Sequence, residues 1–254
     1  MKIKFPTSWE QLNPWQLTEM VSIIDRLREN EDFTHTYIRM VQILLMKNNS
    51  LWQYLKMRRI LRNIPISAFQ EATAFLMEQP KLYRFPAIKG AIAPTDRIGN
   101  CTMEQFSFAD TLLYRYHSTD KEDERNLYAR QIVAVLYRIT PQFDKAILPK
   151  VAAVTDKIPM KQARMIVFIF SSIRNYITEI YPAVFSKPKK EATAPDFSSK
   201  KHIPFNKIVT MMAADELRLL GNLKECQNTL VYDFFNAFLE SKRIHELKAK
   251  AMKQ

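Results

Sequence analysis

Residues 159–182, PMKQARMIVFIFSSIRNYITEIYP, are the stretch that decides the fold. A proline stands at each end, where it can begin a helix or stop one from continuing. Between the two prolines, apolar residues recur at the three- and four-residue spacing of one helical face. They are Met165, Ile166, Ile169, Phe170, Ile173 and Ile177. This wide stripe predicts a long helix at the centre of a core and therefore a mainly helical protein.

The rest of the chain fits the same class. Asn13-Pro14 begins a helix, and the apolar spacing predicts two more helices before residue 62. Thr102 to Gln105 form a capping box that opens another. Prolines and glycines interrupt residues 63–100, where Leu82–Ile92 could form a small hairpin turning at Lys89-Gly90. We expect an irregular multi-helix bundle with a proline-rich middle segment.

A change in amino-acid composition toward the C-terminus predicts boundaries between parts of the chain. Residues 186–204 are polar, basic and proline-bearing, which is typical of a flexible linker. We therefore expect a helical body over 1–185, the linker over 186–204 and a C-terminal helical module over 205–254. In that module Phe205–Leu220 reads as one helix ended by Gly221, and Asn228 or Thr229 is expected to cap the last helix.

Scarcity of glycine excludes several classes of function. The chain has 3 glycines in 254 residues, Gly90, Gly99 and Gly221. Phosphate-binding loops and nucleophile elbows need glycine for positive φ angles and close backbone approach. Neither motif can be written in this sequence, so nucleotide binding and α/β-hydrolase chemistry are not expected.

The residues that usually carry chemistry are dispersed. The 4 histidines lie in separate segments, and His245-Glu246 lacks the second histidine that a zinc-binding helix needs. Cys101 and Cys226 are isolated and read as buried apolar residues. Asp110 and Asp144 lie among apolar residues, where a carboxylate could serve acid–base chemistry, but they could equally lie on exposed faces of their helices. We predict a protein that is not an enzyme and carries no metal and no cofactor.

Charge and hydropathy bear on location and partners. The net charge is +12, which leaves acidic proteins, nucleic acid and anionic surfaces open as partners. Apolar runs are far shorter than the ~20 residues that cross a bilayer. The N-terminal residues lack the apolar region of a secretory signal. We expect a protein of the cytoplasm with no membrane partner.

Two sets of basic residues are candidates for contact with a polyanion. The first, Lys56, Arg58, Arg59 and Arg62, follows Trp52 and Tyr54 in a mixture typical of nucleic-acid binders. The alternative, which we favour, is an amphipathic helix whose core face needs Trp52, Leu55 and Ile60. The second set lies in the linker: Lys189, Lys190, Lys200 and Lys201.

The last helix carries the clearest apolar pattern. It forms a continuous ridge of Leu230, Val231, Phe234, Phe235, Phe238 and Leu239. A small module after a linker has little core of its own, so part of this ridge must meet the body or another protein. The predicted partner-binding residues are Leu230, Phe234, Phe235 and Phe238.

Several stretches together resemble a family of uncharacterised helical proteins encoded in the tail-gene region of bacterial prophages. They are residues 6–17 (PTSWEQLNPWQL), 100–111 (NCTMEQFSFADT), 114–116 and 132–138. Residues 208–242 are similar to phage tail assembly chaperones, small helical proteins that keep the tape-measure protein soluble before the tail tube polymerises. Such chaperones are usually shorter than this chain.

The resemblance implies a non-enzymatic assembly factor of the bacterial host cytoplasm whose partner is a tape-measure or tail tube protein. Two other functions stay open. A virion structural subunit, such as a tail or connector protein, would remain in the particle. A DNA-binding or packaging accessory protein would explain the charge, with weak and sequence-independent binding.

Overall fold

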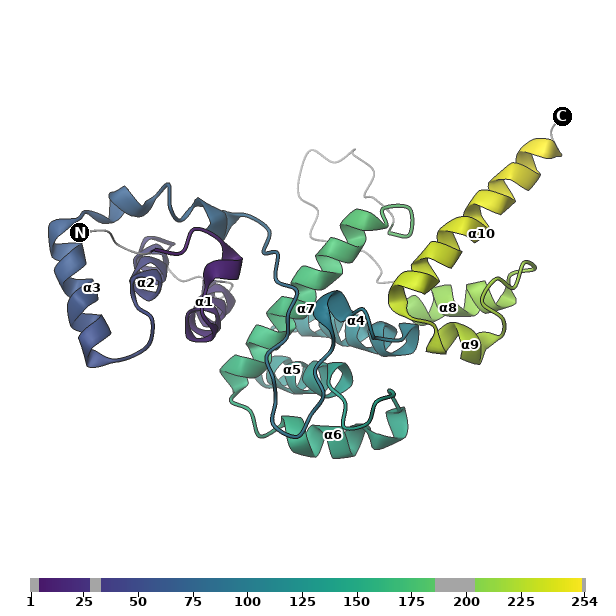
Figure 1. The fold of residues 1–254 in the computed structure, drawn as a ribbon, viewed down its shortest axis with the longest axis horizontal. Helices are drawn as coiled ribbons and strands as arrows, with labels where there is room; N and C mark the ends of the chain where they lie inside the picture. The colour runs from purple at the N-terminus through teal and green to yellow at the C-terminus, as the bar shows by residue number, and fades with distance from the viewer. Residues whose placement is uncertain (1–4, 28–32, 186–203, 253–254) are drawn as a thin grey trace. The chain divides into compact units, whose positions relative to one another are not determined.

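A computed structural model describes residues 5–27, 33–185 and 204–252 (Figure 1). These residues form α-helices and short 3₁₀ helices, without β-strands, so the prediction of a mainly helical protein is confirmed. The segment that could form a hairpin turns at Lys89-Gly90, where Gly90 has a φ of 83°. Within the segment a single β-bridge joins Ile88 and Ala91, and Ile92 forms a bridge with Arg138 instead of extending a hairpin.

The chain forms two compact units, each built from two separate segments. Unit 1 comprises residues 1–82 and 158–172, and unit 2 comprises residues 83–157 and 173–254. These boundaries differ from those expected from the sequence. The expected body is divided, and the C-terminal helices belong to unit 2. Apart from Pro204, the expected linker lies outside the described residues.

The described residues of the N-terminal segment of unit 1 form the α-helices α1 (Pro14–Leu27), α2 (Phe33–Leu45) and α3 (Leu51–Asn63). It also contains the 3₁₀ helices η1 (Trp9–Gln11), η2 (Ile66–Phe69) and η3 (Ala74–Met77). Asn13 caps α1, since its side-chain oxygen accepts a hydrogen bond from the Gln16 amide at 3.0 Å. Ser50 caps α3 in the same way through Gln53. All three helices lie where the sequence predicts them.

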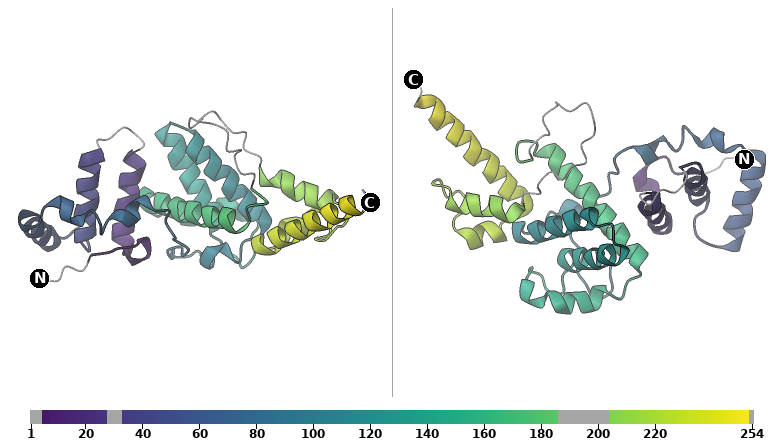
Figure 2. Two further views of the ribbon diagram at one scale, coloured as in Figure 1. Left: turned by 90° about the horizontal axis from the view of Figure 1, so that it is seen from above. Right: turned by 180° about the vertical axis from the view of Figure 1, so that it is seen from behind.

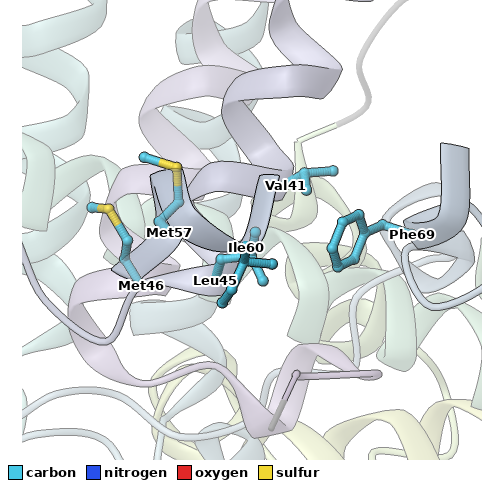
Figure 3. Packing of buried hydrophobic residues seen from close by; sticks show 6 residues of the cluster. All are labelled: Val41, Leu45, Met46, Met57, Ile60 and Phe69. Atoms are coloured by element: carbon cyan, nitrogen blue, oxygen red, sulfur yellow. The ribbon is translucent and has the colours of Figure 1, made fainter. Parts of the chain in front are cut away.

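A compact apolar cluster joins α2 and α3 in unit 1. Its buried members are Val41, Leu45, Met46, Met57, Ile60 and Phe69 (Figure 3). Met57 and Ile60 are three residues apart and therefore share one face of α3. They are the only residues of that helix that are fully buried. The core thus covers a narrow strip of α3.

The helix α7 (Met160–Ile180) supplies residues to both units. All members of the stripe that decides the fold are at most 3% exposed: Met165, Ile166, Ile169, Phe170, Ile173 and Ile177. The prediction of a central apolar helix is confirmed.

Unit 2 is built around α4 (Met103–Ser118) and α5 (Glu122–Leu136), which pack side by side (Figure 2). Thr102 caps α4, because its hydroxyl accepts a hydrogen bond from the Gln105 amide, but the predicted capping box is not completed: the Gln105 side chain donates to the carbonyls of Val135 and Leu136. The further elements are η4 (Asp96–Ile98), η5 (Lys145–Ile147), α6 (Leu148–Thr155), α8 (Phe205–Ala214), α9 (Leu223–Asn228) and α10 (Val231–Ala251).

The C-terminal helices begin and end at other residues than expected. The helix predicted over Phe205–Leu220 ends at Ala214, because the extended backbone of Asp215 takes its carboxylate to residues of α10. Gly221, with a φ of 77°, instead precedes α9, which Asn222 and Glu225 start with a capping box. The cap predicted for the last helix is also wrong, since no side chain caps α10.

Candidate functional site

The predicted partner ridge on α10 is divided by burial. Phe234 and Phe235 have no exposed surface, whereas Leu230 is 40% exposed and Phe238 is half-buried. The ring centroid of Phe235 lies 5.1 Å from that of Tyr181 and 5.8 Å from that of Phe205. The prediction of a partner surface was therefore wrong for Phe234 and Phe235, because they form the core of unit 2.

Backbone hydrogen bonds explain why this end of α10 is buried. The Met103 amide, at the start of α4, donates to the Thr229 carbonyl at 2.8 Å, and the Val231 amide donates to the Cys101 carbonyl at 3.0 Å. The first amides of a helix have no partner within the helix, so both helix starts are satisfied by one short bridge. This bridge brings the first turn of α10 onto α4.

The accessible part of the ridge borders a groove between α8 and α10. Its volume is about 710 Å³, and Phe238 lies in its wall together with Met211, Met212 and Ser241. Met211 is 68% exposed, whereas Met212, the next residue of α8, is 3% exposed. Methionine adapts its shape to irregular apolar partners, which suits a groove that accepts a helix.

Sequence reasoning missed Met211. Phe205, Val209 and Met212 follow the spacing of a buried face of α8. Met211 falls outside that face, so the sequence contained a signal for its exposure. The sequence did not indicate that α10 would lie beside it, since that depends on the packing of separate segments.

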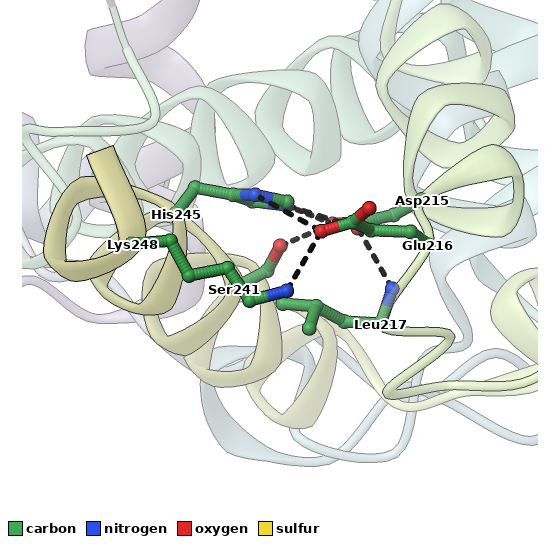
Figure 4. A network of polar contacts seen from close by, with 6 residues as sticks. All are labelled: Asp215, Glu216, Leu217, Ser241, His245 and Lys248. Atoms are coloured by element: carbon green, nitrogen blue, oxygen red, sulfur yellow. Dashed lines mark hydrogen bonds and ion pairs between the residues drawn. The ribbon is translucent and has the colours of Figure 1, made fainter. Parts of the chain in front are cut away.

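Members of a polar network, drawn in Figure 4, also line the groove: Asp215, Glu216, Ser241 and His245. The Asp215 carboxylate accepts hydrogen bonds from the Ser241 hydroxyl and from the Leu217 amide, and lies 3.0 Å from His245 Nε2. The hydrogen bond from Ser241 has the largest effect on the carboxyl, and together with that from Leu217 it holds the pKa of Asp215 below its usual value. The network ties the middle of α10 to the chain that follows α8.

A second ion pair extends this network. Lys248 Nζ lies 2.8 Å from Glu216 Oε1, and its hydrogen bond lowers the pKa of the Glu216 carboxyl. Both side chains are largely exposed, so this pair is expected to contribute little to global stability.

The predicted polyanion contacts on α3 are exposed. Lys56, Arg58, Arg59 and Arg62 all lie on the surface of unit 1. The expected core face was wrong in two of its three members: Ile60 is buried, but Trp52 is 82% exposed and Leu55 is 49% exposed. The narrow strip formed by Met57 and Ile60 is sufficient to attach the helix, which leaves the tryptophan outside.

The other predicted polyanion contacts cannot be placed. Lys189, Lys190, Lys200 and Lys201 lie outside the described residues.

Two carboxylates and a cysteine, residue types that can carry chemistry, have the following surroundings. The Asp110 carboxylate is 1% exposed and accepts a hydrogen bond from Arg174 Nε at 2.6 Å. Asp144 caps η5 by accepting from the Ala146 amide. Burial raises the pKa of the Cys101 thiol to about 12, which keeps it protonated at neutral pH.

Within residues 5–27, 33–185 and 204–252, no group of three or more His, Cys, Asp or Glu side chains has an arrangement that could hold a metal ion. No helix in this part of the chain is long and apolar enough to cross a bilayer. Comparison with family models, curated proteins and solved structures finds no match to this chain.

Proposed function

We propose that this protein is a non-enzymatic assembly factor of a phage tail, a chaperone that binds a helix of the tape-measure protein in the groove between α8 and α10. The observation that carries the proposal is the exposed Met211 beside Phe238 in a groove of about 710 Å³. An apolar helix of a partner would remove both side chains from water. The resemblance of residues 208–242 to tail assembly chaperones supports the same assignment, since this segment contains both residues.

The experiment is a binding assay with a phage tape-measure protein. Met211→Glu places a charge in the groove and should weaken binding at least about tenfold, because a carboxylate resists burial against apolar groups. Met77 provides a matched control: it is 69% exposed, against 68% for Met211, and does not line this groove. Met77→Glu should leave binding within about twofold.

Equal losses in the two variants would show that added charge alone weakens binding, and no loss in either would exclude the groove. Both results contradict the proposal. Circular dichroism of each variant establishes that the comparison is made on folded protein.

The virion-subunit alternative makes a different prediction, which purified particles can test. A chaperone should be absent from them by mass spectrometry. A tail or connector subunit should be present at a fixed copy number.

A DNA-binding accessory protein is the second candidate, favoured by the exposed cations of α3. Binding that depends on counterion release is steeply sensitive to salt. A protein that makes about 6–10 phosphate contacts would bind DNA about 10³–10⁵ times more weakly at 200 mM salt than at 50 mM. Tight binding to one DNA sequence at the higher salt concentration would place this function first.

A further inference from the structure

The outward face of α3 combines exposed apolar side chains with exposed cations. In its first turns Leu51 is 73% exposed, Trp52 is 82% exposed and Leu55 is 49% exposed. Lys56, Arg59 and Arg62 follow on the surface, and none of them has an ion-pair partner among the residues that the structure describes. Exposed apolar residues of this size on one helix are typical of an interaction surface.

The spacing of these residues suits a helical partner. Trp52, Lys56, Arg59 and Asn63 recur at four, three and four residues, so they line one side of α3. From Trp52 to Asn63 this side extends about 16 Å, or three helical turns. It borders a groove of about 720 Å³ that is also lined by Leu55 and Ile64.

We propose that α3 binds an acidic amphipathic helix of a partner protein. The partner's apolar residues pack on Trp52 and Leu55, and its carboxylates pair with Lys56 and Arg59 of the groove and with Arg62 on the exposed surface beside Arg59. Charge complementarity identifies the occupant, because α3 contains no acidic residue and the whole chain carries a net charge of +12. This surface is in unit 1 and is separate from the groove between α8 and α10.

Other occupants fit less well. Nucleic acid would use stacked aromatic rings, but the Arg58 guanidinium already lies over the Tyr54 ring at 5.9 Å, and leucines do not stack on bases. A second copy bound symmetrically would bring α3 cations together. An anionic bilayer would need a continuous apolar face, whereas Arg59 and Arg62 share the sector that contains Leu51, Leu55 and Trp52.

The test uses two synthetic peptides of about 20 residues with identical composition, long enough to form helices. The first peptide has a single binding face along its helix. Leucines form that face in one half of the peptide, and glutamates form it in the other half. In the second, the same residues are shuffled so that no face forms. Fluorescence anisotropy should show binding of the first peptide at least about tenfold tighter than of the second.

Variants of the full chain locate the site. Trp52→Ala and Arg59→Glu should each weaken binding of the first peptide about tenfold or more. Lys150→Glu, at an exposed residue of α6, changes the net charge as Arg59→Glu does and should alter binding less than about twofold. Circular dichroism shows whether each variant keeps the helical fold.

Four results would overturn the proposal. Equal affinity for the two peptides would reduce the effect to charge alone. Tighter binding of single-stranded oligothymidine through Trp52 and Arg59 would make α3 a nucleic-acid surface. Trp52-dependent binding to vesicles containing phosphatidylserine would make it a membrane surface. A dimer in sedimentation that Trp52→Ala dissociates would make it a self-association surface.

Discussion

The helices α3 and α10 both carry more apolar residues than their surroundings can cover, and they differ in which ones are buried. In α3 the smaller set of Met57 and Ile60 faces the core, while Trp52 is on the surface. In α10 two of the large aromatic side chains, Phe234 and Phe235, are buried. Periodicity shows that a helix has an apolar face, whereas burial depends on what the neighbouring elements can cover.

Local backbone geometry accounts for part of this difference. The start of α10 is attached to α4 by the hydrogen bonds of Thr229 and Val231, which direct its first turns inward. The start of α3 is capped by its own Ser50, which satisfies the first turn without bringing another element against it. A helix with a local cap can leave a large residue such as Trp52 in water.

The largest expected change in stability follows truncation of a buried phenylalanine of α10. Phe235→Ala should reduce the free energy of unfolding by about 3–5 kcal/mol, because it leaves a cavity among packed aromatic rings. Urea unfolding measures the loss. Phe108→Ala is the control, because Phe108 is 41% exposed on α4 and its removal should cost much less. Equal losses would mean that Phe235 is not a core residue.

A smaller and local effect is expected when the pH is lowered. The pKa of Asp215 is lower in the folded chain than its ordinary value of 3.8. The contribution of the charged carboxylate to stability is therefore fully present above pH 3.8. It is lost as the pH falls through the depressed pKa. Hydrogen-exchange protection in residues 241–251 should therefore decrease between about pH 5 and pH 2.

Two comparisons isolate that pH effect. The same residues in Asp215→Asn should have lower protection at neutral pH and a weaker dependence on pH. Residues 51–63 of α3, which include no carboxylate, should not show a change centred on this transition. Protection in residues 241–251 that is unaffected by Asp215→Asn would exclude the network as its cause.

The smallest effect is expected on α3. Trp52→Ala should change the free energy of unfolding by no more than about 0.5 kcal/mol, because little of this side chain is removed from water on folding. Trp9→Ala is the matched substitution in the same unit, where Trp9 is 4% exposed and contacts Phe75 and Phe168. Its loss should be about 3–5 kcal/mol. Similar losses in thermal unfolding would contradict the assignment of Trp52 to the surface.

Elements whose signals are local could be predicted from the sequence. Asn13-Pro14, Thr102 and the stripe between Pro159 and Pro182 place α1, α4 and α7, since capping and periodicity involve residues close in the chain. The end of α8 could not be predicted. It depends on the contact of Asp215 with Ser241, 26 residues further along the chain.

The candidate sites were predicted only in part. The sequence indicates the cations of α3 and the accessible Phe238, because both follow from composition and helical spacing. It does not indicate that Trp52 is exposed or that Met211 lies beside Phe238. Both depend on which faces the packed elements leave uncovered.

Tryptophan fluorescence tests the central claim, that α3 exposes Trp52 among cations, most directly. Iodide should quench the folded protein more strongly than caesium, because Lys56 and Arg59 attract the anion near the indole ring. In Trp52→Phe most of the iodide-accessible fluorescence should disappear, because Trp9 is buried and Trp15 is largely covered. An accessible fraction that is unchanged by Trp52→Phe would show that the tryptophan of α3 is buried and would contradict this account.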